Sequence, residues 1–250
     1  MKLTIPSTIN KNNKSGWCPG CGHGIIIRML AEAIDELGIQ EKVILVTDVA
    51  CGQLAVNVVE WNDIGAAHGR PIITAAGAKR ARPDQIVIAN PGDGSAYSIG
   101  IESTIHCALR NENILALVTN NCVFGMTGGQ MSPESLPGQV TTSSPYGRDP
   151  KVNGNTFDVV KTLGQYDIAY LARGSVSSPA NVIKSQKMIK KALEKQMRGE
   201  GFCLVEILSP CPTNWGFADD KAYKALEYMK EHQEKFYQLG EFVDKGGEKE

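Results

Sequence analysis

The chain has 250 residues, 42% of them hydrophobic, so it is long enough for one large domain with a full core. Its 26 basic and 27 acidic residues give a net charge of −1, which argues against nucleic acid or an anionic membrane as the main partner. No apolar run reaches the length of about 18 residues that a membrane span needs, and residues 1–16 lack the apolar stretch of a signal peptide. We therefore expect a cytoplasmic protein whose seven cysteines serve metal binding or catalysis rather than disulfides.

The N-terminal part of the chain places three cysteines near predicted structural boundaries. Cys18 and Cys21 lie two residues apart around a Pro-Gly turn, which points both thiolates at one centre. An apolar stripe predicts a helix over 25–37. A strand predicted over 43–46 then leads to Cys51, a third thiol just past a strand end. The run His68-Gly69-Arg70 and an element of mixed character over 72–81 follow.

The most informative stretch runs from a predicted strand over 85–89 to a second one over 114–118. The first strand ends in Gly92-Asp93-Gly94, a helix is predicted over 96–109, and the second strand stops at Asn120-Asn121. In an open parallel sheet, ligands bind outside the carboxyl ends of the strands. Asp93 and Asn121 are therefore expected at one edge, where they could share one hard cation.

A carboxylate, an amide oxygen and a nearby carbonyl suit Mg²⁺, which keeps its remaining positions for phosphate oxygens. The glycines beside Asp93 allow the backbone to approach a diphosphate closely. The alternative interpretation is that Gly-Asp-Gly and Asn-Asn are only two turns.

Beyond the asparagine pair, residues 124–155 are rich in Gly, Pro, Ser and Thr and show no sustained periodicity. Such a long irregular stretch points to a site loop or a subunit contact, and its start, 124–130, can form a nest of N–H groups for phosphate. Regular alternation then resumes, with helices predicted over 156–163, 180–197 and 219–237, strands over 168–172 and 202–208, and a frayed GGEKE tail. Alternating strands and helices predict a single α/β domain over 1–250, with a doubly wound, mostly parallel sheet.

Four cysteines are candidates for one metal centre. Cys51 and Cys211 both follow predicted strands at the sheet edge of Asp93, and the Cys18–Cys21 pair can reach that edge from the N-terminal loop. Four thiolates would complete a site for zinc or for an iron–sulfur cluster, and the spacing alone does not choose between them. The other three thiols, at Cys107, Cys122 and Cys203, are better explained as small buried hydrophobes.

Two of the four histidines have open roles. His23 either supports its loop or contacts the metal centre, and His106 on a helix is expected to be a packed or surface side chain.

The Gly-Asp-Gly turn, followed 28 residues after its Asp by the second Asn of a pair, resembles the thiamine-diphosphate motif. That resemblance implies that Asp93, Asn121 and the main-chain carbonyl of Val123 hold Mg²⁺. The runs WCPGCGHG, HGR, FGMTGGQMSP, SPYGRD and SPCPTNWG occur with it in order, over roughly residues 14–240. Together they resemble the β subunit of the 2-oxoacid:ferredoxin oxidoreductases.

This resemblance implies a thiamine-diphosphate-binding fold of the diphosphate-domain type, with an N-terminal cluster-binding segment at about 14–24 and a C-terminal helix. It implies one [4Fe–4S] cluster on Cys18, Cys21, Cys51 and Cys211. The residues implied around thiamine diphosphate are Gly52, His68, Gly69, Gly92, Gly94, Ser95, Thr127 and Gly128.

The activity implied is oxidative decarboxylation of a 2-oxo acid with coenzyme A to acyl-CoA and CO₂, with electrons passed to ferredoxin in anaerobic metabolism. Thiamine enzymes need an activating glutamate from a pyrimidine-binding domain, and Glu102, on the helix after the Gly-Asp-Gly turn, is a poor candidate for it. An α subunit is therefore expected to supply that glutamate within a hetero-oligomer, with optional γ and ferredoxin-like δ subunits.

Departures from the family pattern bear on the substrate. Many members carry a basic residue shortly after the third cysteine or in the Gly-Met-Thr loop, where this chain has Leu54 and Gly128. Since a second substrate carboxylate needs a cationic partner, the resemblance favours branched-chain acids such as 2-oxoisovalerate over 2-oxoglutarate. Two rival interpretations are a component of a non-oxidative thiamine-diphosphate enzyme and a zinc-stabilised nucleotide-binding scaffold.

Overall fold

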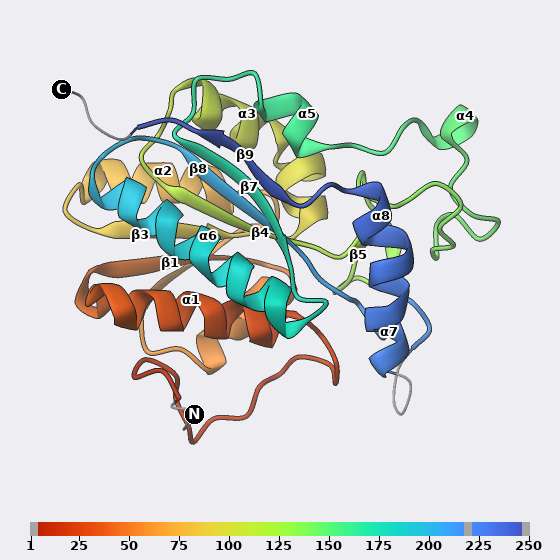
Figure 1. Cartoon of the computed structure of the whole chain (residues 1–250), viewed down its shortest axis with the longest axis horizontal. Coiled ribbons are helices and arrows are strands. Elements are labelled where there is room, and N and C mark those ends of the chain that lie inside the picture. Colours follow the sequence, from red (N-terminus) through yellow and green to blue (C-terminus); the bar gives the residue numbers. More distant parts are fainter. Residues whose placement is uncertain (1–4, 218–221, 247–250) are drawn as a thin grey trace.

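The computed structural model describes residues 5–217 and 222–246 and is built on a seven-stranded sheet (Figure 1). Its order is β2-β1-β3-β4-β8-β7-β9. Every neighbouring pair is parallel except β7 and β9. The mostly parallel, doubly wound α/β sheet predicted from the sequence is therefore confirmed. The strands are β1 (Val43–Asp48), β2 (Asn62–Ala66), β3 (Ile86–Asn90), β4 (Leu115–Asn120), β7 (Tyr170–Ser175), β8 (Cys203–Leu208) and β9 (Gly240–Asp244).

Helices cover both faces of the sheet. The helices α1 (His23–Leu37) and α6 (Pro179–Met197) lie side by side on one face (Figure 1). The other face is covered by α2 (Pro71–Ala81), α3 (Ile101–Leu109) and the short α5 (Val159–Leu163). A hydrophobic core lies on each face of the sheet, and neighbouring residues of one strand pack into different cores, as Leu45 and Val46 do on β1. Burial on both faces explains why the central strands read as continuous apolar runs.

The helix boundaries follow local capping chemistry. Gly38 adopts a left-handed conformation (φ 65°) directly after α1 and ends it. Ser178 accepts a hydrogen bond from the backbone N–H of Asn181 through its side chain, and Pro179 occupies the first turn of α6. Asp158 caps α5 in the same way by accepting from the N–H of Val160, so that helix begins later than the predicted 156.

Two strands of the seven-stranded sheet are absent from the sequence prediction. The strand β2 has a polar, glycine-containing sequence and lies at an edge, with its first four residues exposed, so no alternating apolar pattern marks it. The antiparallel strand β9 forms the opposite edge. The predicted element of mixed character over 72–81 is the helix α2.

The C-terminal helix predicted over 219–237 is confirmed over 222–236, where the chain is helical without a break. Its first residues lie outside the described part of the chain, and the rest divides into α7 (Ala222–Tyr228), a π-helical turn (Met229–Gln233) and α8 (Glu234–Phe236). The strand β9 follows, so the described chain closes on a strand. Of the predicted GGEKE tail, residues 247–250 lie outside the described part.

The segment 124–155 is largely irregular, as predicted, and holds only β5 (Val123–Phe124) with β6 (Gln130–Met131) and the short α4 (Pro150–Asn153). Figure 1 shows α4 on an arm that projects from the body of the domain. Buried Arg148 holds the base of this arm, because its guanidinium donates hydrogen bonds to five backbone carbonyls. These belong to Ser132, Pro133, Ser135, Gly154 and Asn155.

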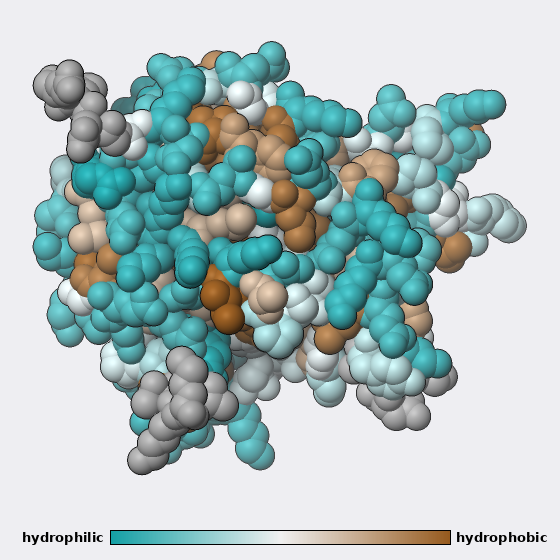
Figure 2. All heavy atoms as spheres, in the orientation of Figure 1, coloured by the Kyte–Doolittle hydropathy of each residue, from teal (hydrophilic) through white to brown (hydrophobic). Residues whose placement is uncertain are grey.

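The face of the molecule in Figure 2 is mainly hydrophilic, with apolar side chains in small separate groups. Among the helices of the described residues, none is long and apolar enough to cross a membrane. The three cysteines assigned to packing, Cys107, Cys122 and Cys203, are all buried.

Candidate cofactor site

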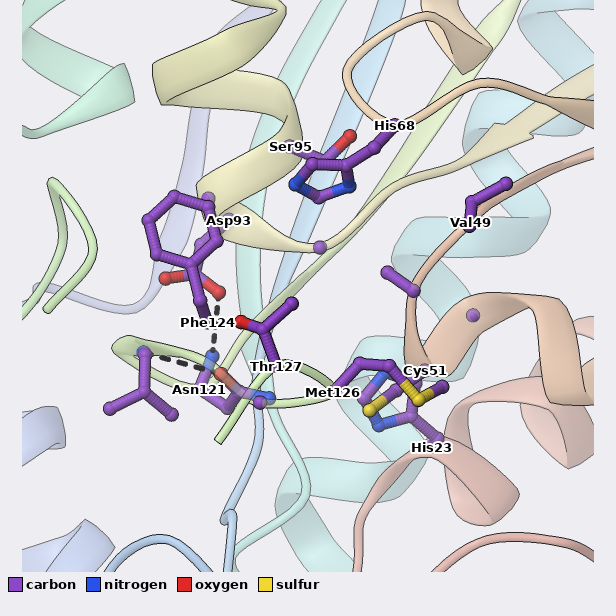
Figure 3. A pocket seen from close by; sticks show the side chains of 16 residues that line it. His23, Val49, Cys51, His68, Asp93, Ser95, Asn121, Phe124, Met126 and Thr127 are labelled. Atoms are coloured by element: carbon purple, nitrogen blue, oxygen red, sulfur yellow. Dashed lines mark hydrogen bonds between the residues drawn. The ribbon is translucent and has the colours of Figure 1, made fainter. Parts of the chain in front are cut away.

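Four strands deliver polar side chains to one edge of the sheet. The strand β1 ends at Asp48, Asp93 follows β3, Asn121 follows β4, and Cys211 follows β8. Since β1, β3, β4 and β8 are consecutive parallel neighbours in the sheet, these carboxyl ends meet at one edge. A pocket of about 630 Å³ opens there (Figure 3). It is lined by His23, Val49, Ala50, Cys51, Gly52, His68, Gly92, Asp93, Gly94, Ser95, Asn121, Val123, Phe124, Gly125, Met126 and Thr127.

Asp93 lies at the base of this pocket with only 1% of its surface exposed. Its Oδ2 accepts a hydrogen bond from Ser132 Oγ at 2.5 Å, and its Oδ1 accepts from the backbone N–H of Asn121 at 3.5 Å. Burial raises the pKa of Asp93 to about 7, against the hydrogen bond from Ser132 that lowers it. A buried carboxylate with so little charge compensation is suited to a hard cation.

Asn121 and Val123 face the same pocket because the chain turns sharply between them. Cys122 has a positive φ of 59°, which is uncommon outside glycine. Asn121 Oδ1 accepts from the Val123 N–H at 3.3 Å, and Trp215 Nε1 donates to the Asn121 carbonyl at 3.1 Å. Figure 3 shows Asp93 and Asn121 close together, with the Phe124 ring beside them. The predicted meeting of Asp93 and Asn121 at one sheet edge is confirmed.

A second polar group on the pocket wall is the pair His68–Asp48. His68 Nδ1 lies 3.1 Å from Asp48 Oδ2, and Asp48 is fully buried, which leaves His68 Nε2 for the pocket. The next residue, Gly69, donates its N–H to Ser95 Oγ at 3.1 Å. The Phe124 ring packs edge-on against the His68 imidazole, with centroids 6.0 Å apart. Asp48 is therefore a positioning residue for His68.

The four candidate thiols converge at the other end of the pocket, where Cys51 and His23 lie in Figure 3. Burial raises the pKa of Cys21 to about 12, with additional repulsion from Cys211, Cys51 and Cys18. The pKa of Cys51 is raised to about 11, again mainly by burial and then by Cys211 and Cys18. This mutual influence confirms that all four thiols share one neighbourhood.

The four thiols are held by backbone hydrogen bonds in turns and lie near side-chain nitrogen atoms. The Cys21 N–H donates to the Cys18 carbonyl at 3.1 Å, which closes the Pro-Gly turn. His23 Nδ1 lies 3.2 Å from Cys21 Sγ, so the structure places His23 beside a candidate ligand. Burial lowers the pKa of His23 to about 4, which keeps this imidazole neutral.

Within residues 5–217 and 222–246, no three His, Cys, Asp or Glu side chains are close enough to hold a single metal ion. The thiols share a neighbourhood but do not close around one atom. The finding does not bear on Asp93, Asn121 and Val123, because that set combines only one carboxylate with an amide and a backbone carbonyl.

Of the positions predicted around the diphosphate and the substrate, three do not line the pocket. Gly69 donates its N–H to Ser95, and Gly128 lies inside the turn after β5, where its φ of +113° requires glycine. Leu54 packs beside Gly16, with its Cδ2 3.3 Å from where a Gly16 Cβ would stand. Neither Leu54 nor Gly128 is among the residues that line the pocket.

Several residues that shape the site are not among the predicted ligands. Ser132 touches Asp93 although 39 residues separate them, and Arg148 positions the segment that carries Ser132. Trp215 contacts Asn121 across the sheet edge. These three residues belong to the runs FGMTGGQMSP, SPYGRD and SPCPTNWG, and Asp48 ends a predicted strand, so the sequence marks their segments but not their contacts.

The comparisons agree with this architecture. Residues 52–207 match the family described as "Thiamine pyrophosphate enzyme, C-terminal TPP binding domain", thiamine pyrophosphate being another name for thiamine diphosphate. The fold and the site at the carboxyl ends of the strands therefore define a thiamine-pyrophosphate-binding domain.

Curated relatives narrow the family. The chain is 39% identical over 235 residues to the ketoisovalerate oxidoreductase subunit VorA of Methanothermobacter thermautotrophicus, covering 94% of this chain and 49% of that protein. It is 36% identical over 219 residues to the 2-oxoglutarate synthase subunit KorB of Methanocaldococcus jannaschii, covering 86% of this chain and 77% of that one. The chain thus spans about half the length of the ketoisovalerate relatives.

A solved structure is also similar. A 2-oxoglutarate:ferredoxin oxidoreductase from Magnetococcus marinus, with 2-oxoglutarate, coenzyme A and succinyl-CoA bound, superposes with a TM-score of 0.77 at 26% identity. The alignment covers 99% of this chain and 87% of that chain. This chain belongs to the family of thiamine-pyrophosphate-binding subunits of 2-oxoacid:ferredoxin oxidoreductases.

Proposed function

We propose that this chain binds thiamine diphosphate through Mg²⁺ and holds one [4Fe–4S] cluster, as a subunit of a cytoplasmic enzyme that oxidatively decarboxylates a 2-oxo acid. The products are acyl-CoA, formed with coenzyme A, and CO₂, and ferredoxin receives the electrons. The observation that carries this proposal is one pocket with buried Asp93 and Asn121 at one end and Cys51, the pocket-lining member of the four thiols, at the other.

The residues at the Asp93 end fit a magnesium diphosphate. Asp93 Oδ1, Asn121 Oδ1 and the Val123 carbonyl are the oxygen donors that would hold Mg²⁺. A Cβ on Gly92 would meet only the Thr119 carbonyl, at 3.9 Å, so packing within the chain does not require glycine there. The open space above Gly92 suits the close approach of a diphosphate.

The remaining proposed contacts surround that space. His68, Ser95 and Thr127 line it as hydrogen-bonding side chains, Gly52 and Gly94 line it as small residues, and Gly69 and Gly128 shape the adjacent backbone. Asp48 fixes the His68 ring, and Phe124 helps to exclude water at the pocket wall.

Four thiolates suit an iron–sulfur cluster, which spreads its ligands over several iron atoms. Cys18, Cys21, Cys51 and Cys211 would be those ligands. Four thiolates also suit a single zinc ion, so analysis of iron and sulfide distinguishes the two.

When bound, thiamine diphosphate supplies the electron sink for decarboxylation and the cluster accepts single electrons. This chain's own residues bind and orient these groups. The pocket lining includes no glutamate, and Glu102 is a half-exposed residue paired with Arg70 at 2.8 Å. The activating glutamate is therefore proposed to come from an α subunit with a pyrimidine-binding domain, with γ and δ subunits as optional further partners.

The proposed substrate is a branched-chain 2-oxo acid such as 2-oxoisovalerate. The pocket lining contains Met126 and Val49 but no Lys or Arg, so no residue that lines the pocket would pair a second carboxylate. The relatives include both ketoisovalerate and 2-oxoglutarate enzymes, and 2-oxoglutarate is the second candidate.

The test is cofactor analysis of the anaerobically purified complex and of two variants. Asp93→Asn should lose most of its thiamine diphosphate and keep its iron and sulfide, because the carboxylate belongs to the magnesium site. Cys51→Ser should lose iron and sulfide, whereas Cys107→Ser, in the core, should keep them.

The outcomes also separate the rival functions. Zinc in place of iron would support the scaffold, and thiamine diphosphate without iron or sulfide would support a non-oxidative enzyme. Stoichiometric thiamine diphosphate in Asp93→Asn would show that the magnesium site is wrongly assigned.

A further inference from the structure

Asn214 joins the cysteine end of the pocket to the diphosphate end. Its Nδ2 donates one hydrogen bond to Cys211 Sγ at 3.3 Å and a second to the Gly125 carbonyl at 2.9 Å. A side-chain amide has two N–H donors, so both bonds can form at once. The reverse orientation would point Oδ1 at a carbonyl oxygen and a sulfur, so the two acceptors fix the amide as described.

The turn over 125–129 rests on this amide. Gly129 has a φ of +81°, and a Cβ there would lie 2.9 Å from Asn214 Oδ1, so only glycine fits. At the other end of the turn, a Cβ on Gly125 would lie 3.5 Å from Cys51 Sγ. The turn that carries Met126 and Thr127 into the pocket is thus packed against Asn214 and one of the four thiols.

The residue after Asn214 makes a parallel connection. Trp215 Nε1 donates to the backbone carbonyl of Asn121 at 3.1 Å. The short segment 211–215 therefore contacts a candidate cluster ligand, the diphosphate turn and a candidate magnesium ligand. A displacement of Cys211 cannot occur without disturbing at least one of these bonds.

We propose that Asn214 is a positioning residue that couples the iron–sulfur centre to the thiamine-diphosphate site; this inference rests on the proposed function. Its N–H bond to the Cys211 thiolate stabilises the more negative, reduced cluster and so raises the reduction potential. Its bond to the Gly125 carbonyl holds the turn in the form that receives the diphosphate. Because coupling between two sites is reciprocal, a change at either site should be felt at the other through this residue.

The experiment compares Asn214→Ala and Asn214→Asp with the wild type in the anaerobic, cluster-loaded complex. One readout is the midpoint potential from an electron paramagnetic resonance titration, and the other is the Kd for thiamine diphosphate at fixed Mg²⁺. Both variants should retain iron, shift the potential downwards and weaken thiamine diphosphate several-fold. Asn214→Asp should shift the potential further, because its carboxylate repels the thiolate as well as lacking the donor.

Each result has a defined meaning. Asn155→Ala, at an exposed position on the projecting arm, is the matched control and should leave both readouts unchanged. Wild-type potential and Kd in both Asn214 variants would overturn the coupling, and so would loss of iron with no shift in the remaining clusters, which marks a merely structural role. Absence of iron and thiamine diphosphate from the wild type would instead overturn the proposed function, and this inference with it.

Discussion

At the scale of single residues, Glu134 shows that the buried surroundings of the site disfavour an ionised side chain. Only 1% of its surface is exposed, and neither carboxyl oxygen has a hydrogen-bond partner among the described residues. Burial raises the pKa of Glu134 well above its usual range, and the nearby Asp93 and Glu206 raise it further. Burial therefore favours the protonated, neutral form of Glu134, which limits the negative charge behind Asp93.

This protonation makes the stability of the protein dependent on pH. In the unfolded chain Glu134 ionises above its ordinary pKa of about 4.5, whereas in the folded chain it stays neutral. The stability from this group is complete below about pH 4.5 and is lost as pH rises, by up to about 1.4 kcal/mol per pH unit, until the raised pKa is reached. Glu134→Gln removes this titration. The difference in free energy of unfolding between this variant and the wild type should therefore shift in favour of the variant as pH rises above about 4.5.

Urea unfolding at several pH values without Mg²⁺ measures this difference. The control is Glu102→Gln, since Glu102 is half-exposed in a surface pair with Arg70 and should change stability by less than about 1 kcal/mol. A gap between Glu134→Gln and the wild type that does not change with pH would contradict the neutral assignment.

At the scale of elements, a buried ion-pair network locks the later strands behind the site. Arg173 on β7, with 1% of its side chain exposed, pairs with Glu206 on β8 and, at 2.7 Å, with Asp158 at the start of α5. Its guanidinium also lies 4.7 Å from the centre of the Tyr237 ring, just past α8. Asn120, at the end of β4, donates to Glu206 at 3.1 Å. The network thus reaches from the outer strands to the strand end that carries Asn121.

Removal of the Arg173 guanidinium should strongly destabilise the folded protein. Arg173→Met leaves Glu206 buried with no cationic partner and should lower the free energy of unfolding by about 3–5 kcal/mol. Lys190→Met, which breaks an exposed 2.8 Å pair with Glu36, should cost far less stability, because solvent screens an exposed pair. Denaturant midpoints measure the stability of both variants. Equal losses of stability would show that the buried Arg173 network stabilises the protein no more than an exposed ion pair does.

At the scale of the whole molecule, the pocket lining provides cofactor ligands but no residue suited to activate thiamine diphosphate or to pair a second substrate carboxylate. We therefore expect this chain alone to show no turnover and the assembled complex to be active. In that complex, kcat/KM for 2-oxoisovalerate should exceed that for 2-oxoglutarate by at least about tenfold, since burying an unpaired carboxylate is costly.

A substrate panel with coenzyme A and an electron acceptor measures this ratio. Full turnover by the isolated chain would refute the need for a partner. A preference for 2-oxoglutarate would show that a partner chain supplies the cation.

The fold class and the positions of the candidate ligand residues can be predicted from the sequence alone. Strand ends are recognisable where a buried apolar run meets Gly-Asp-Gly or Asn-Asn, and parallel strands must present those ends at one edge. The positions of Asp93, Asn121, Cys51 and Cys211 therefore follow from local pattern and sheet geometry together. Edge strands such as β2 and β9 escaped prediction because one-sided or absent burial removes the apolar pattern.

The tertiary structure was needed to show which side chains support those ligands. Ser132 on Asp93, Asp48 on His68 and Asn214 on the Gly125 carbonyl are contacts between segments that are distant in sequence. It also showed that Leu54 faces Gly16 rather than the pocket. Such contacts depend on how loops cross the strand ends. Different sequences can form the same crossing, so the periodicity of the chain does not predict these contacts.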